Sequence, residues 1–170
     1  MPSFTGPRRA FCAAGFHFLW TIRKIIGIIL YMLSKSPEET IEAGREYAQK
    51  LKGGEVIGLI GELGSGKTTF IKGLAEGLRV DETITSPTFV ILKSYSAKIQ
   101  QKKIEFIHID AYRVESIDDI KSVGIEDYIG REDAIVVVEW AEKIREILPK
   151  NTIYINFKHR KEYEREVIVG

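Results

Sequence analysis

The spacing of apolar residues between positions 36 and 78 predicts two helices separated by a short buried strand. Residues 36–52 carry apolar side chains at helical spacing, and the glycine pair at 53–54 ends this run. Ser36 and Glu39 have the spacing of a capping box, with Pro37 at the first helical position. The apolar run at 55–60 suits a buried strand, and residues 68–78 return to helical spacing. The apolar helical positions are Gly44, Tyr47, Ala48 and Leu51, then Phe70, Ile71, Leu74 and Leu78.

Beyond residue 88 the pattern predicts strands that alternate with short helical segments. Two strands are expected at 89–96 and 103–110, separated by a polar stretch. Residues 115–129 predict short helical pieces that break at Gly124. A buried strand at 134–140 and a short helix at 141–148 follow, and strands at 152–157 and 165–170 flank a charged turn. This alternation predicts an α/β fold with a central, mainly parallel sheet flanked by helices and an antiparallel C-terminal extension.

Residues 1–33 are expected to form an N-terminal extension outside the fold, and residues 34–170 a single domain. The segment 11–33 is apolar, but Arg23 and Lys24 interrupt it near its middle. Each would cost about 2.5–3.5 kcal/mol inside a bilayer, so we expect no membrane span. No small-residue cleavage site of a signal peptide follows the apolar stretch. An organelle-targeting segment remains an alternative to the reading that we favour, in which Met32 is the natural start.

The charge distribution argues against a self-sufficient nucleic-acid binder. The net charge is +1, yet residues 1–37 hold five basic residues and no acid. This leaves 20 of the 25 basic residues and all 24 acids in the remainder, a net charge of −4. Any RNA would therefore be reached through a partner. Cys12 is the single cysteine, which excludes an internal disulfide and a metal site built on cysteines.

Residues 61–68 carry the chemistry most readily recognised in the chain. They match the pattern G-x-x-x-x-G-K-[ST], with Gly61, Gly66, Lys67 and Thr68 in the required positions. Glycines allow several backbone N–H groups to point at one anion, and the helix that follows adds the positive end of its dipole. Lys67 can bind the β- and γ-phosphates, and the Thr68 hydroxyl can coordinate Mg²⁺. The motif thus predicts a P-loop nucleotide site.

Two acids at strand ends are candidates for holding the magnesium ion or its waters. Glu139 ends the strand predicted at 134–140, and Asp110 ends the one at 103–110. The carboxyl ends of parallel strands face the crevice where ligands bind. We expect His108 to face away from these acids, as a packed or hydrogen-bonded histidine. Ser86 and Thr88, in the stretch TSPTF, present hydroxyls where nucleotide switches sense the γ-phosphate.

Taken together and in this order, the blocks GELGSGKTTF, SPTF, HIDAYRV, GIEDY and VEW resemble the TsaE (YjeE) family. The resemblance covers residues 34–170. It implies a small P-loop NTPase fold that binds ATP with Mg²⁺ in the cytoplasm and hydrolyses it weakly when alone. It further implies a role in threonylcarbamoyladenosine modification of tRNA. The partners would be TsaB and TsaD, the ATPase would allow multiple turnovers of their complex, and tRNA would be met through that complex.

The resemblance also implies roles for individual residues. Lys67 and Asp110 would be catalytic, with Asp110 positioning the hydrolytic water, and Thr68 and Glu139 would ligate Mg²⁺. Ser86 and Thr88 would form a switch-like loop, and adenine would pack near Ser36 and Pro37. Arg165 lies in a divergent stretch, so Arg160 is its alternative. The expected ATP-binding residues are Gly61, Glu62, Leu63, Gly64, Ser65, Gly66, Lys67, Thr68, Thr69, Trp140, Glu142 and Arg165.

Other users of a phosphate loop fit the sequence less well. A small-molecule kinase needs an arginine-bearing lid, and the chain offers only Arg131 and Arg145 between residue 129 and Pro149. A GTPase needs an N-K-x-D segment that reads guanine, and none is present. A nucleotide-gated binding module without productive hydrolysis stays open as an alternative, because only kinetics separates it from an ATPase.

Overall fold

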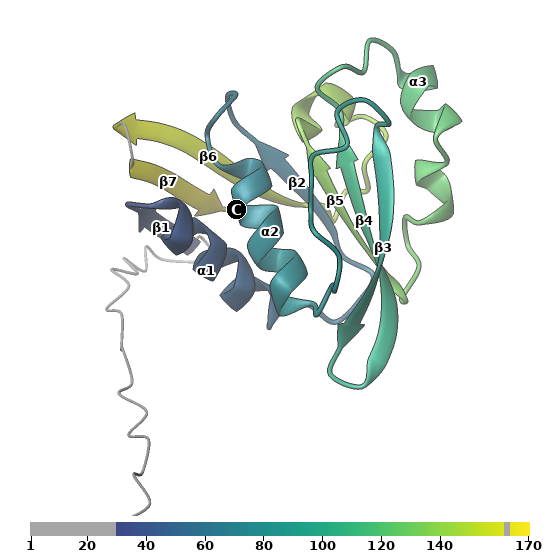
Figure 1. Ribbon diagram of the computed structural model, residues 1–170. Helices are drawn as coiled ribbons and strands as arrows, with labels where there is room; N and C mark the ends of the chain where they lie inside the picture. The colour runs from purple at the N-terminus through teal and green to yellow at the C-terminus, as the bar shows by residue number, and fades with distance from the viewer. Residues whose placement is uncertain (1–29, 162–163) are drawn as a thin grey trace, which may run out of the picture.

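The computed structural model describes residues 30–161 and 164–170 (Figure 1). These residues form a seven-stranded mixed sheet in the order β1-β7-β6-β2-β5-β4-β3. The helical elements are α1 (Pro37–Ala48), α2 (Lys67–Gly77), α3 (Ile117–Ser122), η1 (Ile125–Asp127) and η2 (Ala141–Ile144), the last two being 3₁₀ helices. The strands are β1 (Leu30–Ser34), β2 (Val56–Ile60), β3 (Leu92–Ile99), β4 (Lys102–Asp110), β5 (Ala134–Glu139), β6 (Ile153–Lys161) and β7 (Glu164–Val169).

The centre of the sheet is parallel and both of its edges are antiparallel. Strands β6, β2, β5 and β4 pair in parallel, which confirms the predicted core of the fold. The antiparallel β6–β7 pair is the expected C-terminal extension. The opposite edge carries a second antiparallel pair, β3–β4, whose turn lies in the polar stretch at 100–101. That stretch therefore shapes a hairpin and does not separate two independent strands.

Side-chain alternation along the central strands divides the core into two layers. On β4, Ile104 and Phe106 pack with α1 and α2, whereas Ile107 and Ile109 pack with α3, η1 and η2. Each strand therefore buries both of its faces, as expected for a parallel sheet covered by helices. Figure 1 shows α1 and α2 lying together across the sheet, with α3 apart from them.

Helices α1 and α2 approach each other backbone to backbone. A Cβ atom at Gly44 would lie 2.2 Å from the Phe70 carbonyl oxygen, and one at Gly73 would lie 1.9 Å from the Ile41 carbonyl oxygen. Real Cβ atoms do not tolerate such separations, so these positions require glycine. This contact sets where α2 begins relative to α1, and hence where the phosphate loop lies.

Several sequence-based boundaries need correction. Residues 30–33 belong to β1, which pairs with β7, so the folded part of the chain includes them and does not begin at residue 34. The rest of the N-terminal extension lies outside the described residues. The capping box is half formed, because Glu39 accepts from the backbone of Lys35 and not from that of Ser36. Within the described part of the chain, no helix has the length and apolar character of a membrane span.

Two further elements differ from the sequence pattern. Strand β3 begins at Leu92 and not at residue 89, because Phe89 and Val90 form an exposed turn. The helix expected at 141–148 is a 3₁₀ helix that ends at Ile144. Strand β6 also extends into the charged stretch, which shortens the turn before β7.

Candidate nucleotide-binding and hydrolysis site

The phosphate loop joins β2 to α2 and depends on glycine conformations. Gly61 and Gly66 adopt φ angles of 150° and 103°, which residues with a Cβ atom rarely reach. A Cβ atom at Gly61 would also lie 2.5 Å from the Phe157 carbonyl oxygen on β6. The loop is thus held close to the sheet, and Gly66 caps α2 so that the helix begins at Lys67.

The side chain of Lys67 is folded back over this loop. Its Nζ atom donates to the carbonyl oxygens of Gly61 and Glu62, at 2.6 and 3.0 Å, and lies 4.0 Å from the Trp140 ring centroid. Lys67 is 4% exposed. Burial lowers the pKa of its ammonium group, while the negative charges of nearby carboxylates, Glu139 first, act against that shift. A phosphate would supply the full negative charge that the two carbonyl groups lack.

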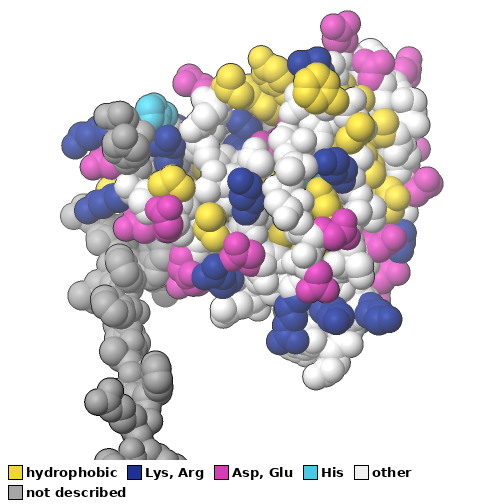
Figure 2. Space-filling view, in the orientation of Figure 1, with side chains coloured by type: hydrophobic (Ala, Val, Ile, Leu, Met, Phe, Trp, Pro, Cys, Tyr) yellow, Lys and Arg dark blue, Asp and Glu magenta, His cyan; other side chains and the backbone are white. Residues whose placement is uncertain are grey.

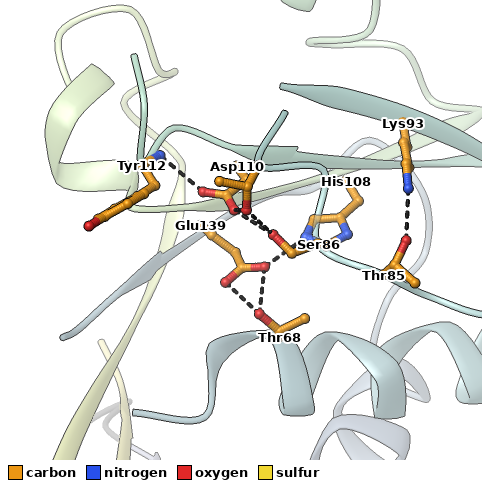
Figure 3. Close-up of polar contacts among 9 residues, drawn as sticks. Thr68, Thr85, Ser86, Lys93, His108, Asp110, Tyr112 and Glu139 are labelled. Carbon is orange, nitrogen blue, oxygen red and sulfur yellow. Dashed lines mark hydrogen bonds and ion pairs between the residues drawn. The ribbon is translucent and has the colours of Figure 1, made fainter. Parts of the chain in front are cut away.

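Glu139, at the end of β5, is tied to the start of α2. The Thr68 hydroxyl lies 2.9 Å from each of its carboxylate oxygens (Figure 3). His108 Nε2 lies 2.9 Å from Oε1 of the same carboxylate. Glu139 is 3% exposed. A buried carboxylate with these partners is oriented before any ligand binds.

Asp110, at the end of β4, is bound by the switch-like loop. Its Oδ2 atom accepts hydrogen bonds from Ser86 Oγ at 2.5 Å and Thr88 Oγ1 at 2.6 Å. Oδ1 accepts from the backbone N–H of Tyr112 at 2.9 Å (Figure 3). The Ser86 and Thr88 hydroxyls also lie 2.6 Å from each other. The loop after α2 is therefore tied to the end of β4 by this carboxylate, and Lys93 of β3 adds a hydrogen bond to Thr85 of the same loop.

The strand register places the two acids side by side. Asp110 and Glu139 are direct partners in the parallel β4–β5 pair. Both acids thus stand at the carboxyl ends of neighbouring parallel strands, as their strand-end positions predicted. His108 does not face away from them as expected: it precedes Asp110 by two residues, and alternation puts both side chains on one face. The expectation that it is a hydrogen-bonded histidine is confirmed.

A cleft of about 320 Å³ unites these groups. Tyr112 and Trp140 form one wall, with ring centroids 5.0 Å apart. Tyr112 was missed by sequence reasoning, although the motif HIDAYRV contains it, because no spacing rule marks an aromatic ring as cleft-lining. Gly61, Glu62, Glu142 and Arg165 do not line the cleft. The lining residues are Leu63, Gly64, Ser65, Gly66, Lys67, Thr68, Thr69, Ser86, Thr88, Asp110, Tyr112, Glu139 and Trp140.

The rim of the cleft is apolar and open. Leu63 of the phosphate loop is 79% exposed and Phe89 beside the switch-like loop is 82% exposed. The guanidinium of Arg113 lies 4.4 Å from the Phe89 ring centroid. Figure 2 shows hydrophobic side chains gathered at the upper edge of the molecule, the edge where the loop before α2 lies in Figure 1.

The two candidate arginines occupy different surroundings. A Cβ atom at Gly66 would lie 3.9 Å from Arg165 Cγ and 3.7 Å from Thr40 Cγ2, so β7 and the start of α1 both reach the phosphate loop. Arg160 instead forms two hydrogen bonds to the Glu166 carboxylate, at 3.0 and 2.7 Å. These bonds hold the pKa of Glu166 below its usual range. Arg165 is therefore the arginine placed beside the loop.

The donor set fits a magnesium ion that arrives with its nucleotide. No group of three His, Cys, Asp or Glu side chains suited to a metal occurs in residues 30–161 and 164–170. Mg²⁺ prefers oxygen ligands and is usually held by one or two protein groups together with phosphates and water. The Thr68 hydroxyl and the Glu139 carboxylate offer such oxygens beside the phosphate loop.

Comparison with known proteins points to one family. The family model described as "Threonylcarbamoyl adenosine biosynthesis protein TsaE" matches residues 34–167. The TsaE protein of Bacillus subtilis is 39% identical over 78% of this chain and 79% of its own length. That of Treponema pallidum is 34% identical over 81% and 98%, respectively.

A solved structure has a similar overall fold. The crystal structure of Bacillus subtilis YdiB superposes with a TM-score of 0.69 at 32% identity, over 86% of this chain and 87% of that one. The family model covers the residues that form the phosphate loop, the two strand-end acids and most of the mixed sheet. On these grounds, the chain belongs to the TsaE family.

Proposed function

We propose that this protein is an ATP-binding and ATP-hydrolysing subunit for threonylcarbamoyladenosine modification of tRNA. It would act in the cytoplasm with TsaB and TsaD partners and meet tRNA through their complex. Family membership supports the pathway, since the related proteins are named for biosynthesis of this nucleoside. The observation that carries the ATPase is the pairing of Asp110 with Glu139 opposite Lys67 and Thr68 in one cleft.

Binding of ATP would begin with the phosphate loop. The N–H groups at the start of α2 and the helix dipole favour an anion there. Lys67 would exchange its two carbonyl partners for phosphate oxygens, whose full negative charge makes the new contact stronger than either bond it replaces. Arg165, beside Gly66, can add a second positive charge. Thr40 of α1 also lies beside Gly66, which supports the expectation that the adenosine part of ATP lies toward the start of α1.

Thr68 and Glu139 would hold Mg²⁺ or its waters beside the phosphates. The bound ion would neutralise charge that develops on the phosphate oxygens during cleavage. Thr68 can offer its oxygen while its proton stays directed at Glu139. Glu139 is buried and oriented beforehand, so this part of the site needs little rearrangement when nucleotide arrives.

Asp110 would orient the water that attacks the γ-phosphorus and take its proton. An ionised carboxylate has about four acceptor positions. Ser86, Thr88 and the Tyr112 N–H use three of them. The remaining position can accept from water, while the three existing bonds fix the direction of the carboxylate. The bond between the γ-phosphorus and the β–γ bridging oxygen then breaks, and ADP and phosphate leave.

Reconstitution tests the proposal directly. The protein is mixed with the matching TsaB–TsaD pair and tRNA, and both ATP hydrolysis and modified tRNA are measured with each component omitted in turn. We expect slow hydrolysis alone, faster hydrolysis with both partners, and repeated rounds of modification only when ATP and this protein are present. Lys67→Ala serves as the inactive control.

Three results would each count against a different part of the proposal. Strong preference for GTP in competition would refute the ATP site. Phosphate transfer to a small acceptor, without free phosphate release, would indicate a kinase. Full support of tRNA modification by a variant that binds ATP and cannot hydrolyse it would indicate a nucleotide-gated module.

A further inference from the structure

His108 is a buried polar side chain that the roles assigned above do not use. It lies on β4, the strand next to the β3 edge of the sheet, and its side chain is fully buried. Phosphate binding and water activation are accounted for by other residues. A polar ring at such a place destabilises a fold unless its hydrogen bonds are made. Its contacts therefore indicate what it does.

The His108 ring reaches from β4 to Glu139 on the neighbouring strand, β5. In the parallel pair, His108 stands opposite Val137, and Glu139 lies two residues farther along β5. Nε2 nevertheless lies 2.9 Å from Glu139 Oε1. Figure 3 shows the ring and the Thr68 hydroxyl reaching the same carboxylate from different sides. Glu139 is thus held both by the sheet and by the start of α2.

Hydrogen-bond chemistry assigns the direction of this contact. A carboxylate accepts only, so the proton is assigned to Nε2, which donates to Glu139. Nδ1 has no hydrogen-bond partner among the described residues. The ring therefore makes its one polar contact with Glu139, and this arrangement favours a function at the carboxylate over a general role in linking the core.

The Thr68 hydroxyl can donate to only one of the two Glu139 carboxylate oxygens at a time. It has one proton for the two carboxylate oxygens, both 2.9 Å away. Its oxygen would also be drawn toward the cation. His108 is not among the residues that line the cleft, so a nucleotide bound there would leave its contact with Glu139 in place.

We infer that His108 is a positioning residue, which fixes the Glu139 carboxylate for the magnesium–nucleotide complex through Nε2–H. The inference rests on the proposed function, since it concerns the same cation. Partners that orient a metal ligand typically change metal affinity by about 10- to 100-fold when removed. The role predicts a defect in magnesium dependence and not in nucleotide binding as such.

The test measures binding of a fluorescent ADP analogue in EDTA and across a magnesium titration. His108→Leu removes the donor at similar size, and His108→Gln replaces it with an amide that reaches about as far as Nε2. We expect His108→Leu to bind as the wild type does in EDTA and to need about 10-fold or more Mg²⁺ for half of the magnesium effect. His108→Gln should lie close to the wild type.

Two controls separate positioning from packing. Phe106→Leu alters a fully buried side chain two residues earlier on the same face of β4 and should leave the magnesium titration unchanged. His108→Asn keeps an amide one methylene too short to reach Glu139, so it should resemble His108→Leu even if the leucine variant unfolds. Thermal unfolding of each variant verifies that it is folded.

The possible failures are distinguishable. If His108→Leu or His108→Asn titrates with Mg²⁺ as the wild type does, the inference is overturned. The same holds if binding in EDTA and in Mg²⁺ weakens equally, or if His108→Gln is no better than His108→Asn. A wild type whose nucleotide binding does not respond to Mg²⁺ would instead refute the proposed magnesium-dependent site itself.

Discussion

Replacing Asp110 by alanine should separate nucleotide binding from hydrolysis. Asp110 contacts the switch-like loop and the Tyr112 backbone, at 2.5–2.9 Å, and among the described residues it makes no hydrogen bond to the phosphate loop. Its removal therefore leaves the phosphate-binding groups in place. Losing the group that orients and deprotonates water typically costs about 10²–10⁴ in rate. This corresponds to about 3–5 kcal/mol of activation free energy.

The same change should lower stability only moderately. Ser86 and Thr88 are half-buried and still have each other as partners, at 2.6 Å. We therefore expect a net loss of about 1–3 kcal/mol, the usual cost of leaving donors to a charged group unpaired. For a domain of this size, that lowers the melting temperature by roughly 3–10 °C. The variant should remain folded at 25 °C.

The assay compares ATP turnover in the presence of the partners with ADP affinity and thermal unfolding. Asp110→Asn is the matched control, because its amide keeps the size of the carboxylate and can still accept from Tyr112 while losing the charge. Both variants should bind ADP as the wild type does and fail to hydrolyse ATP. Wild-type turnover by Asp110→Ala would show that another group handles the water, and the assignment would be wrong.

Three further predictions concern the phosphate loop, the metal ligand and the packing around them. Lys67→Ala and Glu139→Ala should each abolish ATP hydrolysis with partners present, and Lys67→Ala should also weaken ADP binding in EDTA, as measured by fluorescence titration. Gly73→Ala should destabilise the protein by about 1–3 kcal/mol in urea unfolding, because its Cβ atom would overlap the backbone of α1. Arg160→Ala should leave nucleotide binding unchanged and lower stability at neutral pH. Arg160 holds the pKa of Glu166 in the folded protein below its usual range. The stability that this ion pair contributes is therefore fully present above the pKa that Glu166 has in the unfolded chain, and it is lost as the pH falls through the lowered pKa of the folded protein. The stabilities of wild type and variant should therefore converge in acid.

The sequence predicted the central sheet and its site because strong local signals coincide there. Apolar runs end in Asp110 and Glu139, and parallel strands bring such ends together whatever the surrounding loops do. The glycine pattern of residues 61–68 likewise specifies a backbone shape with few alternatives. These features depend on a few neighbouring residues, so a single sequence reveals them.

The features that escaped prediction depend on contacts between distant residues. Strand β1 has the same apolar character as the leader before it, and only its pairing with β7 makes it a strand. Tyr112, which follows β4, forms a wall of the cleft together with Trp140, which follows β5, so its role depends on how the two strands pair. The spacing of His108 and Asp110 on β4 decides which face the His108 ring occupies, but its partner Glu139 depends on the register of β5.

The direction of β1 has a practical consequence for measuring binding on a surface. Two successive antiparallel pairings, β1 with β7 and β7 with β6, make β1 run the same way as β6 and β2. The register also places Leu30 opposite Val169 of β7, which pairs with Ile155 of β6, so Leu30 lies level with Leu59 near the carboxyl end of β2. A tag fused directly ahead of Leu30 would therefore be attached at the β1 edge of the sheet and at the level of the cleft, so a spacer is needed between tag and strand when nucleotide binding is measured on a surface.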